Sequence, residues 1–236
     1  MIKKEILKPI LRYLDFLLNT TLYSRLISQD SKIFDRNDYA ISNLDLIFIH
    51  VMKTGGTSFV QILKEVEKKG VRIKYFGHYG ISIAETSPKP IYCTILRNPV
   101  DRSISLYNHF LRDKKSAYHN LALKGFSTFM RNCKEAQNSF CKKYSGEMDK
   151  DINEDIYNLA LNNLKNFKHV LFFENLDKDF EKIKDIYNLE KNKKYHLNSS
   201  IITDYNDDIK RNISLFYNYY DMKLYNNFKI LSEGSN

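Results

Sequence analysis

The sequence has few residues of the kinds that divide a chain into separate units or cross-link it. Its 236 residues include only four prolines and eight glycines, and neither type gathers in a linker or a repeat. Three cysteines are present, and they cannot all pair. No two of them stand in a C-x-x-C spacing. We therefore expect one main domain, a reducing compartment and no structural zinc site.

A long apolar run is also missing from the N-terminus. Residues 1–40 are predicted to form an amphipathic helical segment, because apolar residues recur at helical spacing and are interrupted by Lys8, Arg12 and Asp15. Such a segment is too polar for a signal peptide or a spanning helix, so we expect a cytoplasmic protein. The segment could make peripheral contact with a membrane, and packing against the main domain, residues 41–236, is the alternative.

Core-forming residues and positive charge are both plentiful. Hydrophobic residues make up 43% of the chain and aromatic residues 14%, which is enough for the core of one domain of this length. Lys and Arg outnumber Asp and Glu by 37 to 28, giving a net charge of +9. This charge favours a polyanionic ligand such as a nucleotide, a nucleic acid, an acidic glycan or a membrane surface. The lysines are scattered along the chain, so the charge alone does not choose among these ligands.

Apolar runs of strand length alternate with segments of helical periodicity. Four strands are predicted, at residues 46–51, 71–76, 91–96 and 169–173. The first is a continuous apolar run, as in a strand that is buried on both faces of a parallel sheet, and His50 is expected to be a core histidine within it. The last predicted helix, about residues 207–230, places Ile209 and Phe216 on its inward stripe. The alternation predicts an α/β fold, a parallel sheet with helices on both faces.

A small-residue turn follows the first strand and opens the first helix. Its residues are Lys53, Thr54, Gly55, Gly56, Thr57 and Ser58. The glycines let the backbone approach a phosphate closely, and the hydroxyls and the helix N-terminus add hydrogen-bond donors. A nucleotide kinase is the competing interpretation, but its P-loop has the lysine after the glycines, whereas Lys53 precedes them. No Mg²⁺-binding aspartate follows a later strand either.

A second motif, residues 94–107, spans the end of the third strand and the start of a helix. Arg97 stands at the strand end and offers a fork of donors, and Ser105, two turns into the helix, can reach the same oxyanion. Asn98 suits the N-cap of this helix. Arg102 is a weaker candidate, because we expect it on the helix surface.

The two motifs together resemble a known family. Residues 48–58 are similar to the 5′-phosphosulfate loop, and residues 94–107 to the 3′-phosphate segment, of carbohydrate sulfotransferases that use 3′-phosphoadenosine-5′-phosphosulfate (PAPS). The heparan sulfate 2-O-sulfotransferase-like group is the nearest in pattern, although Met52 stands where it usually has proline. The resemblance extends over residues 46–231, and it implies a P-loop-NTPase-like sulfotransferase domain.

The resemblance implies transfer of a sulfuryl group from PAPS to a hydroxyl of a glycan or glycolipid, with no metal. Residues 53–58 would hold the 5′ end of the donor, and Arg97 and Ser105 would hold its 3′-phosphate. A lipid-linked or small-molecule hydroxyl is the alternative acceptor. A non-catalytic nucleic-acid-binding module is disfavoured, because the basic residues do not cluster with stacking aromatics.

Sulfuryl transfer is an in-line displacement that needs a base and a group to stabilise the leaving oxygen. Lys53 is expected to stabilise the bridging oxygen as it leaves. Among the six histidines, His78 is the predicted base, because it lies between the two motifs in a region where the family places its catalytic histidine. His109 shares a helix face with Ser105 and could reach a phosphate, although a surface role is its alternative, and Glu174 is a weaker base candidate.

Overall fold

The structure is a computed structural model, and it describes residues 46–76, 80–81, 91–190 and 207–233. The predicted N-terminal segment, its boundary with the main domain and His78 all lie outside the described residues. Those three predictions therefore stay predictions. Within the described residues, no helix is both long and apolar enough to traverse a bilayer.

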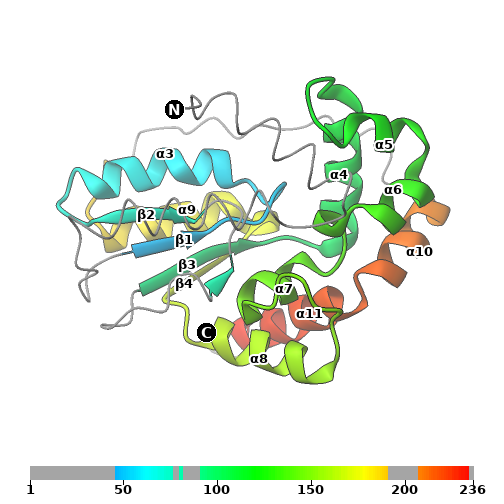
Figure 1. Cartoon of the computed structure of the whole chain (residues 1–236). Coiled ribbons are helices and arrows are strands. Elements are labelled where there is room, and N and C mark those ends of the chain that lie inside the picture. Colours follow the sequence, from blue (N-terminus) through cyan, green and yellow to red (C-terminus); the bar gives the residue numbers. More distant parts are fainter. Residues whose placement is uncertain (1–45, 77–79, 82–90, 191–206, 234–236) are drawn as a thin grey trace, which may run out of the picture.

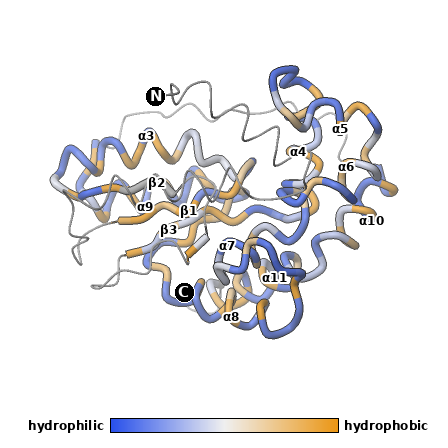
Figure 2. Tube along the Cα trace, viewed as in Figure 1, coloured by the Kyte–Doolittle hydropathy of each residue, from blue (hydrophilic) through white to orange (hydrophobic). Residues whose placement is uncertain are grey.

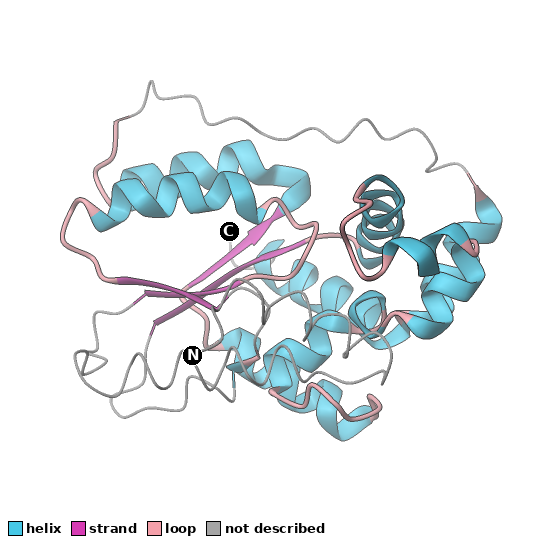
Figure 3. Cartoon of the chain, turned by 45° about the horizontal axis from the view of Figure 1, so that its top comes forward, coloured by secondary structure: helices cyan, strands magenta, loops and turns pink. Residues whose placement is uncertain are grey.

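A parallel four-stranded sheet forms the centre of the molecule (Figure 3). In sheet order the strands are β2 (Ile73–Phe76), β1 (Leu46–Ile49), β3 (Ile91–Leu96) and β4 (His169–Phe172). The chain adds β2 on one side of β1 and β3 on the other, so the strand order reverses between β1 and β3. In open parallel sheets, ligands bind at such a reversal, beyond the carboxyl ends of the strands.

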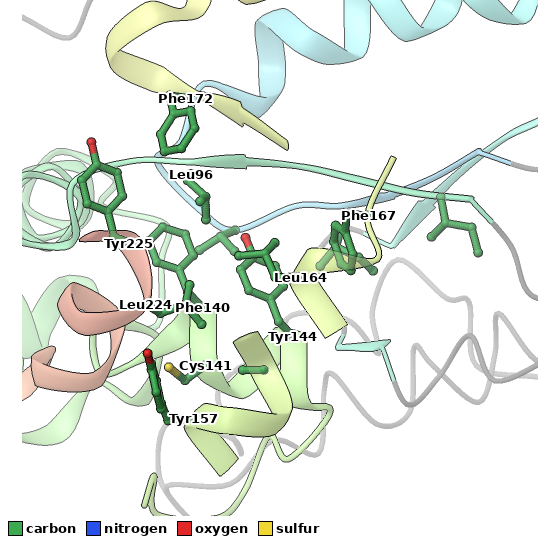
Figure 4. Close-up of a cluster of buried hydrophobic side chains, with 14 residues drawn as sticks. Leu96, Phe140, Cys141, Tyr144, Tyr157, Leu164, Phe167, Phe172, Leu224 and Tyr225 are labelled. Carbon is green, nitrogen blue, oxygen red and sulfur yellow. The ribbon is translucent and has the colours of Figure 1, made fainter. Parts of the chain in front are cut away.

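Helices cover both faces of the sheet, as the sequence predicts (Figure 1). On one face, α3 (Gly56–Glu67) and α9 (Leu176–Ile186) bury their apolar stripes against alternate strand residues, among them Phe48. On the other face, α7 (Ser139–Ser145), α8 (Glu154–Lys165) and α11 (Tyr219–Glu233) pack against the remaining strand residues, among them Leu96 and Phe172 (Figure 4). Successive strand side chains point to opposite faces, so strands buried on both faces must be apolar throughout. Figure 2 shows β1 as a hydrophobic stretch of this kind.

A third group of helices packs beside the carboxyl end of the sheet. It consists of α4 (Pro99–Arg112), α5 (His119–Leu123), α6 (Phe126–Asn132) and α10 (Asp208–Tyr217). These helices share a separate apolar cluster with the short turn η2 (Lys134–Ala136). The second short turn, η3 (Phe173–Asn175), joins β4 to α9. The three cysteines, Cys93, Cys133 and Cys141, are all buried and free.

The prediction of one long C-terminal helix is wrong. The segment forms α10 and α11, which are separated at Asn218. The Asn218 side chain donates to Ser214 O at 3.0 Å and accepts from Asn138 N at 3.0 Å, so the break is tied to the start of α7. Ile209 and Phe216, expected to point inward, are 73% and 77% exposed. Both residues lie in α10, before the break, and the buried residue of this helix is Ser214, which is outside the predicted stripe.

Candidate functional site

The structure brings the two predicted motifs together at one edge of the sheet. β1 and β3 are hydrogen-bonded neighbours, with Phe48 opposite Cys93, so their carboxyl ends lie side by side. Arg97, at the end of β3, donates from Nη1 to the carbonyl oxygen of Lys53 at 2.8 Å. One guanidinium therefore fixes the main chain of the other motif.

The glycines of the first motif are required by close contacts on both sides of the loop. Gly55 has a φ of +87°, and a Cβ placed there would lie 3.1 Å from the Phe173 ring. A Cβ on Gly56 would lie 2.2 Å from Nε2 of His50, a clash. Lys53 also has a positive φ, 69°, a conformation that is uncommon for a residue with a side chain. The backbone of the loop is thus held in a compact, specific shape.

The hydroxyl residues of this motif have different surroundings. Thr54 is fully buried, and its Oγ1 donates to Val51 O at 2.9 Å, which closes the turn. Ser58 is buried in the first turn of α3, whereas Thr57 is exposed there. The helix begins at Gly56, so its first-turn N–H groups face the loop, where an anion is favoured.

Arg97 is held rigidly at the base of the second motif. It is only 3% exposed, and its guanidinium lies 4.1 Å from the centre of the Phe173 ring. Asn98 caps α4 as predicted, because its side chain accepts from two N–H groups of the first turn. Its own N–H donates to Glu174 at 2.7 Å. Glu174, a weaker base candidate in the sequence, thus ties the ends of β3 and β4 together.

Ser105 carries a buried hydroxyl with no hydrogen-bond partner among the residues that the structure describes. Its exposed fraction is only 4%. Ser103, two residues earlier on α4, differs: its hydroxyl donates to Val100 O at 2.9 Å. A buried polar group without a partner costs about 1–3 kcal/mol, so its presence calls for an explanation. An oxyanion bound next to α4 would supply the missing acceptor.

The prediction that Arg102 lies on a helix surface is wrong. The residue is completely buried, and its guanidinium donates to Glu135 O at 3.1 Å and Ala136 O at 3.3 Å. The reason is that α4 is enclosed: the turn η2 packs against this face of the helix. Arg102 therefore holds η2 in place, whereas the hydrogen bond from Arg97 goes to the loop of the first motif.

Arg102 belongs to a buried charge cluster, which consists of Arg102, Glu135, Lys143 and Asp221. Asp221 is fully buried, and its two carboxylate oxygens accept from the backbone N–H groups of Phe140 and Cys141 at 2.9 and 2.8 Å. Burial raises the pKa of Asp221, and the nearby charge of Arg102 opposes that rise. Asp221 thus caps α7 from α11. No local pattern in the sequence predicts this role, because the two N–H groups lie 81 and 80 positions earlier in the chain.

Positive charge accumulates around Lys53. Burial lowers the pKa of Lys53, and the charges of Arg97 and Arg112 lower it further. His109 on α4 is half-buried, and its pKa is lowered by burial, by Lys53 and by Arg112, while Asp113 acts in the opposite direction. We call Lys53, Arg97, Ser105, His109 and Arg112 the binding edge. An arrangement of this kind favours an anion.

His50 does not sit inside a strand, contrary to the prediction. β1 ends at Ile49, and His50 follows it, half-buried, with its ring stacked on Phe48 at 5.4 Å between centroids. Its ring also fills the space beside Gly56. His50 therefore has a packing role at the carboxyl edge of the sheet. His78 lies outside the described residues, so its relation to this edge stays a prediction.

Comparisons with known proteins give two findings. The family model described as "Sulfotransferase family" matches residues 40–226. Among solved structures, the chain is similar to mouse sulfotransferase SULT7A1 complexed with PAP, at 14% sequence identity and a TM-score of 0.43, over 82% of this chain and 73% of that chain. The search of curated proteins gives no match.

Proposed function

The chain belongs to the sulfotransferase family, and from this premise we propose that it transfers a sulfuryl group to a carbohydrate hydroxyl. It is a PAPS-dependent sulfotransferase, and adenosine 3′,5′-bisphosphate (PAP) is the released product. The carbohydrate acceptor rests on the resemblance of residues 48–58 and 94–107 to the heparan sulfate 2-O-sulfotransferase-like group. The match to the family model covers most of the described residues.

One contact supports this proposal most strongly: the 2.8 Å hydrogen bond from Arg97 Nη1 to Lys53 O. It joins the loop that would bind the 5′ end of the donor to the strand end that would bind its 3′-phosphate. A single doubly phosphorylated adenosine must touch both. Two motifs that faced separate parts of the surface would not serve one nucleotide.

The residues present fit the donor. In our proposal, residues 53–58 bind the phosphosulfate through backbone N–H groups, hydroxyls and the Lys53 ammonium. Arg97 and Ser105 bind the 3′-phosphate, and the Ser105 hydroxyl, which has no partner within the described part of the chain, gains an acceptor there. The donor supplies the sulfuryl group. Lys53 then stabilises the negative charge that develops on the bridging oxygen as the S–O bond breaks.

The acceptor and the location rest on sequence alone. A lipid-linked hydroxyl is the second candidate acceptor, favoured by the amphipathic pattern of residues 1–40. A cytoplasmic location, with peripheral membrane contact through that segment, accompanies either acceptor in our proposal. His78 remains the predicted base, outside the described residues. A kinase activity stays disfavoured by the position of Lys53 before the glycines.

The decisive experiment compares two nucleotides and then screens acceptors. We expect PAP to raise the melting temperature of the protein by several degrees, and ATP with Mg²⁺ to raise it far less, because ligands stabilise the state that binds them. Labelled PAPS should then transfer sulfate to a member of a glycan panel. A larger shift with ATP and Mg²⁺ would support a kinase. Transfer to lipid-linked sugars alone would replace the acceptor proposed above.

A further inference from the structure

Phe173 stands between the two motifs, in the turn η3 that follows β4. The Arg97 guanidinium lies over its ring, 4.1 Å from the ring centre. One side of the same ring borders the glycine turn of the first motif. A Cβ placed on Gly55 would lie 3.1 Å from Cδ2 and 3.3 Å from Cε2 of Phe173. A single aromatic side chain, from a third segment of the chain, therefore borders both motifs.

The backbone on either side of Phe173 is anchored. The N–H of Phe172 donates to Oδ2 of Asp179, on α9, at 2.8 Å. On the other side, Oε1 of Glu174 accepts from the N–H of Asn98 at 2.7 Å. The turn is thus tied both to α9 and to the start of α4. Because both of its neighbours are fixed, Phe173 has little freedom to move away from the two motifs.

The contacts around Phe173 form a closed path. Arg97 donates to the carbonyl oxygen of Lys53 at 2.8 Å, and Lys53 and Gly55 belong to one turn. Both residues have a positive φ, 69° for Lys53 and 87° for Gly55. For a residue with a side chain, such a backbone persists only when the surroundings hold it. Arg97 holds this turn at Lys53, and Phe173 borders it at Gly55 and leads back to Arg97.

The contact between Arg97 and Phe173 suits a site that must bind a phosphate. An aromatic ring attracts a guanidinium at this distance, because the face of the ring carries partial negative charge. The ring offers no hydrogen-bond acceptor of the kind that a phosphate offers. It therefore holds the guanidinium in place without competing with a phosphate for the N–H donors.

We propose that Phe173 is a positioning residue that couples the two ends of the donor site. It acts on the 3′-phosphate through Arg97, and on the turn that carries Lys53 through Gly55. This inference rests on the proposed function and adds a consequence to it. Because Arg97 cannot shift without disturbing Lys53, the contact that holds Arg97 contributes to turnover as well as to binding.

Phe172, the preceding residue, provides a matched control. Its side chain points to the other face of the sheet, where it packs with Leu96 and Tyr225 in an apolar cluster (Figure 4). Its ring centroid lies 5.9 Å from that of Tyr225. Loss of the ring at position 172 removes core packing, whereas loss of the ring at position 173 removes the contact with Arg97. The two substitutions should therefore have different effects.

A first test measures nucleotide binding by calorimetry. We expect Phe173→Leu to raise the Kd for PAP about tenfold, the size expected for the loss of a desolvated cation–π contact. The Kd for adenosine 5′-phosphate should rise less than about threefold, because that nucleotide lacks the 3′-phosphate. Phe173→Tyr keeps an aromatic ring and should bind PAP nearly as tightly as wild type. Phe172→Leu should lower the melting temperature and leave both Kd values unchanged.

A second test asks whether Phe173 acts through Arg97. In a protein that already carries Arg97→Ala, Phe173→Leu should raise the Kd for PAP less than about threefold, because the coupled partner is gone. Turnover is measured as PAPS hydrolysis, in which water is the acceptor. At saturating PAPS, Phe173→Leu should lower kcat about tenfold, since Lys53 is less well placed. Phe172→Leu should keep wild-type kcat at a temperature where it is folded.

The outcomes separate this inference from the proposed function. Phe173→Met, which also removes the ring and keeps apolar volume, replaces Phe173→Leu if that variant does not fold. A wild-type protein that binds PAP and hydrolyses PAPS, with unchanged Kd and kcat in these variants, contradicts the inference alone. So does a loss of PAP binding that is as large with Arg97→Ala as without it. A wild-type protein that does not bind PAP contradicts the proposed function, and the inference falls with it.

Discussion

Arg97 and Arg102 stand five residues apart and are both almost fully buried, yet they belong to two regions with different tasks. Arg102 is part of the buried charge cluster, where carbonyl oxygens and the carboxylate of Asp221 surround it. Arg97 is part of the binding edge, where it donates to the Lys53 carbonyl and where its charge and that of Arg112 act on Lys53.

The difference lies in whether opposite charges are present. The buried charge cluster contains both signs and uses its carboxylate to cap a helix, so it stabilises the fold. The binding edge contains an excess of one sign, which is unfavourable in the free protein and becomes favourable when an anion binds. Substitutions should therefore affect stability in the first region and ligand binding or turnover in the second.

The largest expected effect is on stability, from Asp221→Ala. The change leaves two backbone N–H groups of α7 without an acceptor and the Arg102 guanidinium without its nearby carboxylate. Breaking a buried arrangement of this kind costs about 3–5 kcal/mol. Urea denaturation should show this loss, and Asp151→Ala, an exposed control, should stay within about 0.5 kcal/mol of wild type. A loss below 1 kcal/mol for Asp221→Ala would remove the distinction between the two regions.

Lys53→Met should have the next largest effect, which is a decrease in turnover. Without the ammonium, the charge on the leaving oxygen is not stabilised, and we expect kcat to fall about 10²–10³-fold. PAP binding should be partly retained, because Arg97 and Ser105 remain. Lys64→Met, on the exposed side of α3, is the matched control and should keep full turnover. A variant at Lys53 with normal kcat would move the catalytic cation elsewhere.

Arg97→Ala should weaken the binding of one nucleotide much more than the binding of another. We expect the Kd for PAP to rise about 10–100-fold, since charge-assisted hydrogen bonds to a phosphate are worth about 1.5–3 kcal/mol. The Kd for adenosine 5′-phosphate, which lacks the 3′-phosphate, should change much less. Isothermal calorimetry with both ligands gives the comparison. Equal losses for the two would show that Arg97 acts only through the Lys53 carbonyl that it holds.

The smallest effect, and the sharpest contrast, should come from two serines on α4. Ser105→Ala should leave the free protein as stable as wild type or slightly more stable, because its buried hydroxyl has no partner among the described residues to lose, and it should weaken PAP binding a few-fold. Ser103→Ala should cost about 1 kcal/mol of stability, because its bond to Val100 O is lost, and should not change PAP binding. Thermal melts with and without PAP measure both quantities. The reverse pattern would contradict the placement of Ser105 at the binding edge.

Local patterns predicted the elements well, because each depends on neighbours in the sequence. The strand predicted at residues 91–96 matches β3, and Asn98 caps α4 as its side-chain chemistry requires. The continuous apolar run at the first strand correctly indicated a strand buried on both faces. The meeting of the two motifs at one edge agrees with the resemblance, which assigns both motifs to one nucleotide, whereas the order of the strands was not predicted.

Predictions about which way a helical residue faces were less successful. Arg102 was expected at the surface and Phe216 in the core, and the structure reverses both. Helical periodicity gives relative positions on one helix, and it does not tell which side a neighbouring helix covers. The break at Asn218 depends on a hydrogen bond to residue 138, 80 positions earlier in the chain, which no local pattern contains.

By itself, the sequence determined the α/β alternation, the glycine loop with its lysine and the arginine at a strand end, because these are set by residue type and short spacing. Only the tertiary structure decided that Arg102 is enclosed near Asp221, and that the charges of Lys53 and Arg112 act on His109. Burial and the sum of nearby charges control how each of these groups ionises, and both quantities depend on segments that are distant in the chain and adjacent in space.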